Sequence, residues 1–116
     1  MIISKYDYNR LEKYSRNQIK YQLILDLVPE IAKSYFLKRF NFSLSYTQAA
    51  ILLGFGLQYK SLEVIQDELN IPLNQVLAMF NKCVKKVTNY IKGIYEVEIE
   101  KENKLTEKVI IMSKLR

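Results

Sequence analysis

The chain has 116 residues, of which 49% are hydrophobic, and a formal net charge of +6 from 18 Lys/Arg and 12 Asp/Glu. The length fits one domain, and the hydrophobic content excludes a chain that is disordered by composition. Residues 96–116 hold equal numbers of basic and acidic residues, so the basic excess lies in residues 1–95 and favours an acidic partner, nucleic acid rather than a membrane surface.

The residue types that most often carry catalysis and metal binding are scarce. There is no His, which removes the commonest general base and the commonest metal ligand. Cys83 is the only cysteine, and we expect it to be a small buried residue in a reducing compartment. No apolar run reaches the ~18 residues of a membrane span. No phosphate-binding glycine loop is present either, so we expect a non-catalytic, intracellular binding module without a cofactor of its own.

The first half of the chain predicts two helices. Apolar residues recur at helical spacing over 8–28 and indicate one long helix. Pro29, which is favoured in a first helical turn, begins a second helix that runs to about Phe40. Basic residues lie between the apolar positions of both helices, as is typical of an exposed face.

An aromatic and basic cluster lies near the end of the second predicted helix. Tyr35 and Phe36 precede Lys38 and Arg39. Aromatic rings can stack on bases while the cations bind phosphates, which makes Lys38 and Arg39 candidate nucleic-acid contacts. Aromatic residues more often fill a core, and this alternative remains open.

A third helix is predicted over 46–57, capped by Ser43 or Ser45. Apolar residues lie nearly all round it, which predicts the central and most buried helix. Gly54 and Gly56 are poor helix formers. We expect Gly54 to allow close helix packing and Gly56 to lie at the C-terminal turn.

The next two predicted helices resemble a helix-turn-helix. Ser61 can cap a helix over 62–69, and Pro72 can begin a long helix over 73–94. At about 100° per residue, eight residues of the long helix form one apolar side. They are Val76, Phe80, Cys83, Val84, Val87, Tyr90, Ile91 and Ile94.

The opposite side of this long helix is basic and rich in amides. No acidic residue occurs between Leu73 and Tyr95. Lysine supplies positive charge, and asparagine supplies both a donor and an acceptor, so the face suits a phosphate backbone. The candidate nucleic-acid-binding residues here are Lys82, Lys85, Lys86, Asn89 and Lys92. A solvated helix face that contains several lysines is the plainer alternative.

The pattern weakens after residue 95. Residues 96–100 alternate like a strand but would also extend the long helix, and 101–104 indicate a charged turn or linker. We assign no structure to 105–112. The predicted fold is all-α, a compact bundle of about five helices with a helix-turn-helix-like unit and a long C-terminal helix. It comprises a helical domain over 1–95 and a charged tail over 96–116.

Most of the chain resembles the C-terminal region of the RNA cytidine acetyltransferases. The helix-turn-helix pattern alone also resembles region four of bacterial sigma factors, over a much shorter stretch. The segments that carry the first resemblance occur in the family's order between about residues 8 and 95. They are NRLEKYS (9–15), LILDLVP (23–29), AKSYFLKRF (32–40), LSYTQAAILLGFGL (44–57), QYKS (58–61) and LNQVLAMFNKCVKK (73–86).

This resemblance implies a function. In that family the region follows an ATPase module and an acetyl-CoA-binding acetyltransferase module, and is described as a tRNA-binding tail. The whole enzymes make N4-acetylcytidine in tRNA and small-subunit ribosomal RNA, using ATP. The chain is therefore expected to be a non-catalytic part of such an enzyme that positions RNA, with the parent using acetyl-CoA and ATP.

The resemblance also implies partners and a location. The partners would be tRNA, small-subunit rRNA and the other modules of the parent acetyltransferase, with a homodimer open and no membrane. The location would be nuclear or nucleolar in a eukaryote and cytoplasmic in an archaeon or bacterium. Two other functions remain open, a structural or dimerisation module of the same enzyme and a helix-turn-helix DNA-binding regulator.

Overall fold

Five α-helices and one 3-10 helix follow one another in the computed structural model, which describes residues 3–114, without the side chains of Ile99, Glu102 and 104–114. The fold class predicted from the sequence is therefore confirmed. The elements are α1 (Lys5–Ser15), η1 (Tyr21–Leu27), α2 (Val28–Phe36), α3 (Tyr46–Gly56), α4 (Leu62–Leu69) and α5 (Leu73–Lys114).

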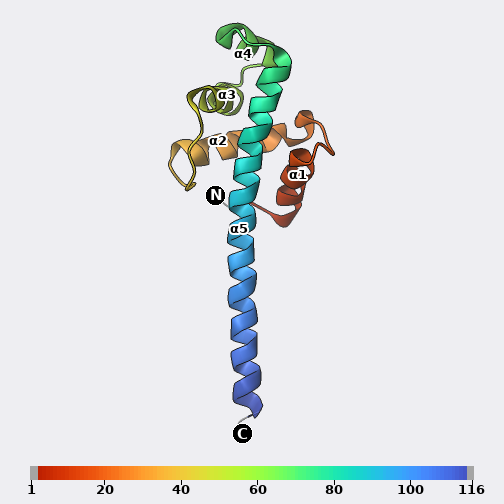
Figure 1. Cartoon of the computed structure of the whole chain (residues 1–116), viewed down its shortest axis with the longest axis vertical. Helices are drawn as coiled ribbons and strands as arrows, with labels where there is room; N and C mark the ends of the chain where they lie inside the picture. Colours follow the sequence, from red (N-terminus) through yellow and green to blue (C-terminus); the bar gives the residue numbers. More distant parts are fainter. Residues whose placement is uncertain (1–2, 115–116) are drawn as a thin grey trace.

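The longest helix, α5, is the axis of the molecule (Figure 1). Helices α1, α3 and α4 pack against it, and α2 packs on α3 and η1. The other elements surround the first half of α5, and the second half extends away from them, which gives extents of 70 × 28 × 19 Å. The central axis is thus α5 rather than the predicted third helix. The prediction that the third helix is the most buried is confirmed, because only Tyr46 of α3 is exposed. The apolar side of α5 is longer than that of any other helix, so more partners can pack on it.

The first helix is shorter than the single helix predicted over 8–28. Ser4 caps it, with its Oγ accepting a hydrogen bond from the Asp7 backbone N–H at 3.0 Å, and the helix ends at Ser15. Asn17 then adopts a left-handed conformation with φ 60°, which asparagine tolerates better than most residues. The chain turns there and continues as η1, so the predicted long helix is wrong.

The second helix begins as predicted but ends early. Pro29 lies in its first turn, and the helix ends at Phe36. Lys38 adopts a left-handed conformation with φ 59°, and the Arg39 backbone N–H donates to the Ser34 carbonyl oxygen at 3.0 Å. Lys38 and Arg39 therefore lie in the connection between α2 and α3, outside any helix.

A capping box begins α3. The Gln48 backbone N–H donates to Ser45 Oγ at 3.2 Å, and the Ser45 backbone N–H donates to Gln48 Oε1 at 3.1 Å. These two bonds satisfy backbone donors that have no partner within the helix. The N-cap of α3 is therefore Ser45, one of the two predicted serines, and not Ser43.

Two glycines let α3 approach its neighbours. A Cβ atom on Gly56 would lie 2.4 Å from the Ala32 Cβ and 3.0 Å from the Val28 carbonyl oxygen. A Cβ atom on Gly54 would lie 3.0 Å from the Ile65 Cδ1. Both glycines are therefore packing residues, and Gly56, which also ends the helix, makes the closer approach.

The α4–α5 pair has the predicted short turn. The Val64 backbone N–H donates to Ser61 Oγ at 3.3 Å, which confirms Ser61 as the cap of α4. Asn70 ends α4 in a left-handed conformation with φ 53°, and Pro72 directly precedes α5. A left-handed residue reverses the chain after α4, and the proline favours the start of the next helix.

The last helix is longer than predicted. It continues to Lys114, through both 96–100 and 101–104. The helical alternative for 96–100 is thus confirmed, and the predicted turn or linker over 101–104 is wrong. Glutamate and lysine have high helix propensity, so a charged stretch without Gly or Pro continues a helix readily. The division of the chain into a folded unit and a charged tail stays a prediction.

The apolar side of α5 forms much of the core. Of its eight predicted members, only Ile94 is exposed, at 41%. Buried partners come from every other element, including Leu11, Ile24, Ile31, Ile51 and Ile65. Cys83 is buried as predicted, its Sγ lies 3.6 Å from the Gln48 carbonyl oxygen, and burial raises the pKa of its thiol to about 12.

Arg10 connects α1 to η1. Its guanidinium donates to Asp26 Oδ1 and Oδ2 at 2.8 and 2.9 Å, to the Leu23 carbonyl oxygen at 3.0 Å and to Asp7 Oδ1 at 2.6 Å. A bidentate ion pair between an arginine and a carboxylate fixes the relative orientation of the two side chains and also stabilises the fold. Arg10 holds the pKa of the Asp26 carboxyl below its ordinary value.

We expect Asp26→Asn to lower the free energy of unfolding by about 1 kcal/mol at pH 7, a modest loss because the Asp26 side chain is 63% exposed. The pKa of Asp26 is lower in the folded state than in the unfolded state, where it is about 4. The ion pair therefore stabilises the fold at pH values above about 4, and this stabilisation is lost as the pH falls through the pKa of Asp26 in the folded state. Urea unfolding of both proteins at pH 7 and near pH 2.5 checks this. A difference of the same size at both pH values would contradict it.

Candidate nucleic-acid interface

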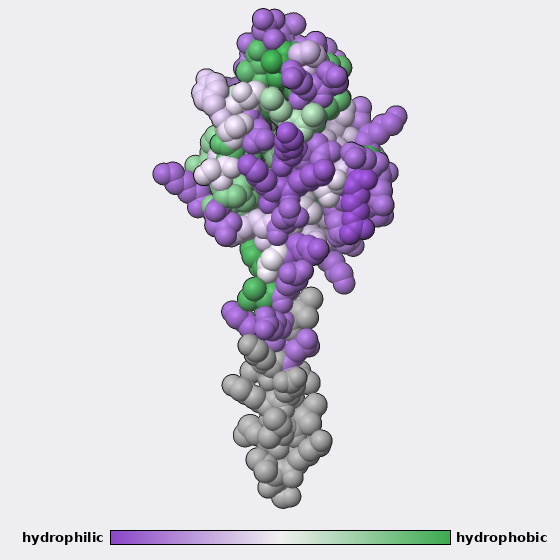
Figure 2. All heavy atoms as spheres, viewed as in Figure 1, coloured by the Kyte–Doolittle hydropathy of each residue, from purple (hydrophilic) through white to green (hydrophobic). Residues whose placement is uncertain are grey.

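The five candidate residues of α5 lie on one exposed side of the helix, which we call the basic face. They are Lys82, Lys85, Lys86, Asn89 and Lys92. Figure 2 shows hydrophilic residues gathered over the upper part of α5 on the viewed side. Their exposure follows from the helical period, because the residues between them are the buried ones of the core.

The lysines of the basic face have no acidic partner within the described part of the chain. The ion pairs found there join Arg10 to Asp7 and Asp26, Arg16 to Glu12, and Lys60 to Glu68. The four lysines of the basic face are absent from these pairs. Their charge is therefore available to an anion, and no internal pair has to be broken first.

Lys86 differs from the other lysines because it has a structural contact. Its Nζ donates to the Ser43 carbonyl oxygen at 3.0 Å, across 43 residues of sequence. This bond fastens the connection between α2 and α3 onto α5. A substitution of Lys86 would therefore change the position of that connection as well as the charge of the surface.

Lys38 and Arg39 lie in the α2–α3 connection rather than on α5. The Tyr90 hydroxyl donates to the Arg39 carbonyl oxygen at 3.2 Å, and Arg39 lines a second hollow with Phe40 and Ile91. The seven predicted residues thus form two groups. Five lie on α5, and two lie in the α2–α3 connection.

The aromatic residues of this region pack mostly on one another. Tyr35 is half-buried, stacks near Phe42 and accepts a hydrogen bond at its hydroxyl from the Leu44 backbone N–H at 2.9 Å. Phe40 and Phe42 stack with ring centroids 5.1 Å apart. The packing alternative is therefore the correct one for Tyr35, while Phe36 remains 40% exposed.

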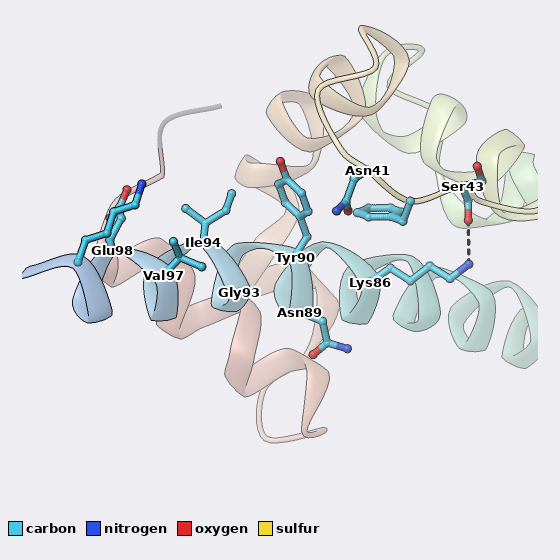
Figure 3. A pocket seen from close by; sticks show the side chains of 11 residues that line it. Asn41, Ser43, Lys86, Asn89, Tyr90, Gly93, Ile94, Val97 and Glu98 are labelled. Atoms are coloured by element: carbon cyan, nitrogen blue, oxygen red, sulfur yellow. Dashed lines mark hydrogen bonds between the residues drawn. The ribbon is translucent and has the colours of Figure 1, made fainter. Parts of the chain in front are cut away.

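A groove runs beside the basic face, between the 41–43 segment and α5 (Figure 3). Its volume is about 810 Å³. It is lined by Asn41, Phe42, Ser43, Lys86, Asn89, Tyr90, Gly93, Ile94, Val97, Glu98 and Lys101. The sequence did not indicate this groove, since it depends on a contact between distant segments. Gly93, a glycine inside a long helix, is the only signal that could have suggested it.

Two other kinds of site are absent from the described residues. No group of His, Cys, Asp and Glu there could hold a metal ion. No helix there is both long and apolar enough to cross a membrane.

Comparison with known proteins points to one family. Residues 1–114 match the sequence profile of a family described as "Possible tRNA binding domain". The chain is 40% identical over 107 residues to an RNA cytidine acetyltransferase of Mus musculus and 42% identical over 111 residues to that of Schizosaccharomyces pombe. Each match covers 91% of this chain but only 10% and 11% of the relative. The chain therefore spans about a tenth of the length of these curated relatives.

Proposed function

We propose an RNA-binding function for this chain, which belongs to the family described as "Possible tRNA binding domain" and is similar to part of the RNA cytidine acetyltransferases. The observation that carries the proposal is the basic face of α5, whose exposed lysines have no acidic partner among the described residues. Cations free of internal pairs can neutralise phosphates and release their counterions, which is the main source of affinity for nucleic acid.

In the parent protein this binding would have a positioning role. The chain would hold tRNA or small-subunit ribosomal RNA so that a cytidine reaches an acetyltransferase site in another module. That module would use acetyl-CoA, and a further module would use ATP. Such a protein would act in the nucleus or nucleolus of a eukaryote, or in the cytoplasm of an archaeon or bacterium.

Binding of the chain to tRNA and to duplex DNA at ~50 to ~200 mM salt tests the RNA-binding function. We expect tighter binding to tRNA, with a log–log salt slope of about −3 if four lysines each neutralise one phosphate. Equal or tighter binding to duplex DNA would favour the DNA-binding regulator. No binding at ~50 mM salt would refute both nucleic-acid functions.

A packing function is the second candidate, because two apolar residues are exposed where α5 leaves the other helices. Ile94 is 41% exposed and Val97 is 51% exposed. They would contact another module of the parent enzyme or a second copy of this chain. Sedimentation equilibrium over a hundredfold range of concentration tests the second copy. A constant monomer mass would exclude a homodimer of this chain, and a rising mass that Val97→Glu abolishes would support it.

A further inference from the structure

We propose that the groove between the 41–43 segment and α5 receives one unpaired nucleotide of the bound RNA. The base would lie over Gly93, and the phosphate would lie beside Lys86. This inference rests on the RNA-binding function proposed above and names the part of the RNA that this site takes. Four features of the groove carry it, namely its empty floor, its fixed aromatic wall, its exposed amide and its charge.

The floor of the groove is open because of a glycine. A Cβ atom on Gly93 would meet no other atom within 4 Å. Tyr90 and Val97, one turn to either side on α5, line the groove with it, and Asn41 and Phe42 line it from the α2–α3 connection (Figure 3). The volume of about 810 Å³ is within the range of about 300–1,000 Å³ that is usual for small-molecule sites. A flat aromatic base fits such a space.

The Tyr90 side chain is held in place before any ligand arrives. Its ring packs edge-on against the rings of Phe40 and Phe42, with centroids 5.1 and 6.2 Å away. Its hydroxyl donates to the Arg39 carbonyl oxygen. A fixed ring loses little conformational freedom when a base stacks on it, which favours binding.

The amide of Asn41 supplies polar recognition. Its side chain points toward α5 beside Tyr90 (Figure 3) and is exposed, with no hydrogen bond to another residue of the described chain. An amide offers a donor and an acceptor, as the edge of a nucleobase does. In duplex RNA the Watson–Crick edge of a base is occupied by its partner, whereas a base in a loop or bulge can present that edge to a side chain, so the base that meets Asn41 would be unpaired.

The charge along the groove sets the direction of the nucleotide. Lys86 belongs both to the basic face and to the groove, so a backbone bound on that face would reach the groove at this residue. Glu98 and Lys101 line the other end with opposite charges, so the unbalanced positive charge that attracts a phosphate lies at Lys86. The groove therefore suits one nucleotide whose phosphate lies at Lys86.

The test compares a fully paired RNA hairpin with the same hairpin carrying one bulged nucleotide, each bound to the chain at ~100 mM salt. We expect the bulged hairpin to bind about tenfold tighter. Gly93→Leu, which fills the floor with a good helix former, should remove this preference and leave binding to the paired hairpin unchanged. Asn74→Leu adds the same side chain to an exposed position of α5 outside the groove and should keep the preference.

The outcomes separate this inference from the function on which it rests. Equal binding of the two hairpins by the unaltered chain, or a preference that survives in Gly93→Leu, would overturn the inference and leave RNA binding intact. Failure to bind either hairpin at ~50 mM salt would overturn both. A circular dichroism melt shows whether each variant is folded, and Gly93→Ala replaces Gly93→Leu if the latter unfolds, with a smaller loss of preference expected.

Discussion

Replacing Lys82, Lys85 and Lys92 together by Glu is expected to weaken binding to tRNA at least a hundredfold at ~100 mM salt. Three phosphate contacts would be lost, and the new carboxylates would repel the backbone. The slope of log affinity against log salt should also fall in magnitude by about 2, since each single-strand contact contributes about 0.7. Fluorescence anisotropy with labelled tRNA at several salt concentrations measures both quantities.

The choice of these three lysines follows from the structure. All three are exposed and have no acidic partner among the described residues, so their replacement should leave the free energy of unfolding nearly unchanged. Lys86 is left intact because its bond to the Ser43 carbonyl oxygen holds the α2–α3 connection.

The matched control replaces three exposed lysines outside the basic face by Glu. They are Lys5, Lys20 and Lys33. This control changes the net charge by the same amount, so a purely long-range effect of charge would weaken binding equally in both variants. We expect a much smaller loss for the control. Equal losses would contradict the assignment of the basic face as the contact surface.

Gly56→Ala is expected to lower the free energy of unfolding by about 1–3 kcal/mol, the usual cost of overpacking a core. The added Cβ would lie 2.4 Å from the Ala32 Cβ and 3.0 Å from the Val28 carbonyl oxygen, so α2 and α3 would have to separate. Backbone atoms cannot move aside as a flexible side chain can. Urea denaturation followed by circular dichroism measures the loss.

Two other glycines provide graded controls. Gly93→Ala should raise the free energy of unfolding by about 0.5–1 kcal/mol, because alanine is the better helix former and meets no atom within 4 Å. Gly54→Ala should have an intermediate effect, since its Cβ would meet the movable end of Ile65. Equal stabilities of the Gly56→Ala and Gly93→Ala variants would show that close packing at Gly56 is not required.

The sequence predicted residues 73–94 of α5 and the two faces of that part correctly, because a long helix repeats its pattern many times. The buried apolar residues from Val76 to Ile91 all recur at helical spacing, so one residue that departs from the pattern does not change which side of the helix is predicted to be buried. The caps at Ser45 and Ser61 were also predictable, since they depend on neighbouring residues alone.

The early ends of α1 and α2 were not predictable from the same pattern. Both ends involve a residue other than glycine in a left-handed conformation, Asn17 after α1 and Lys38 after α2. A lysine gives no local signal for such a conformation, so the surrounding packing decides it. The groove was missed for a related reason. It lies between segments that meet through contacts such as the bond from Lys86 Nζ to the Ser43 carbonyl oxygen, and no local pattern reveals a contact across 43 residues.

The most direct test of the account is a nuclear magnetic resonance titration of the isotopically labelled chain with tRNA. The account predicts that the shifted backbone amides lie in 82–93 of α5, which carries the basic face, and in 41–43, which borders the groove. Helix α4 lies at the opposite end of the bundle from the projecting half of α5 (Figure 1), and the chemical shifts of its backbone amides should not change. Shifts confined to α4, or no shifts at a saturating concentration of tRNA, would contradict the account.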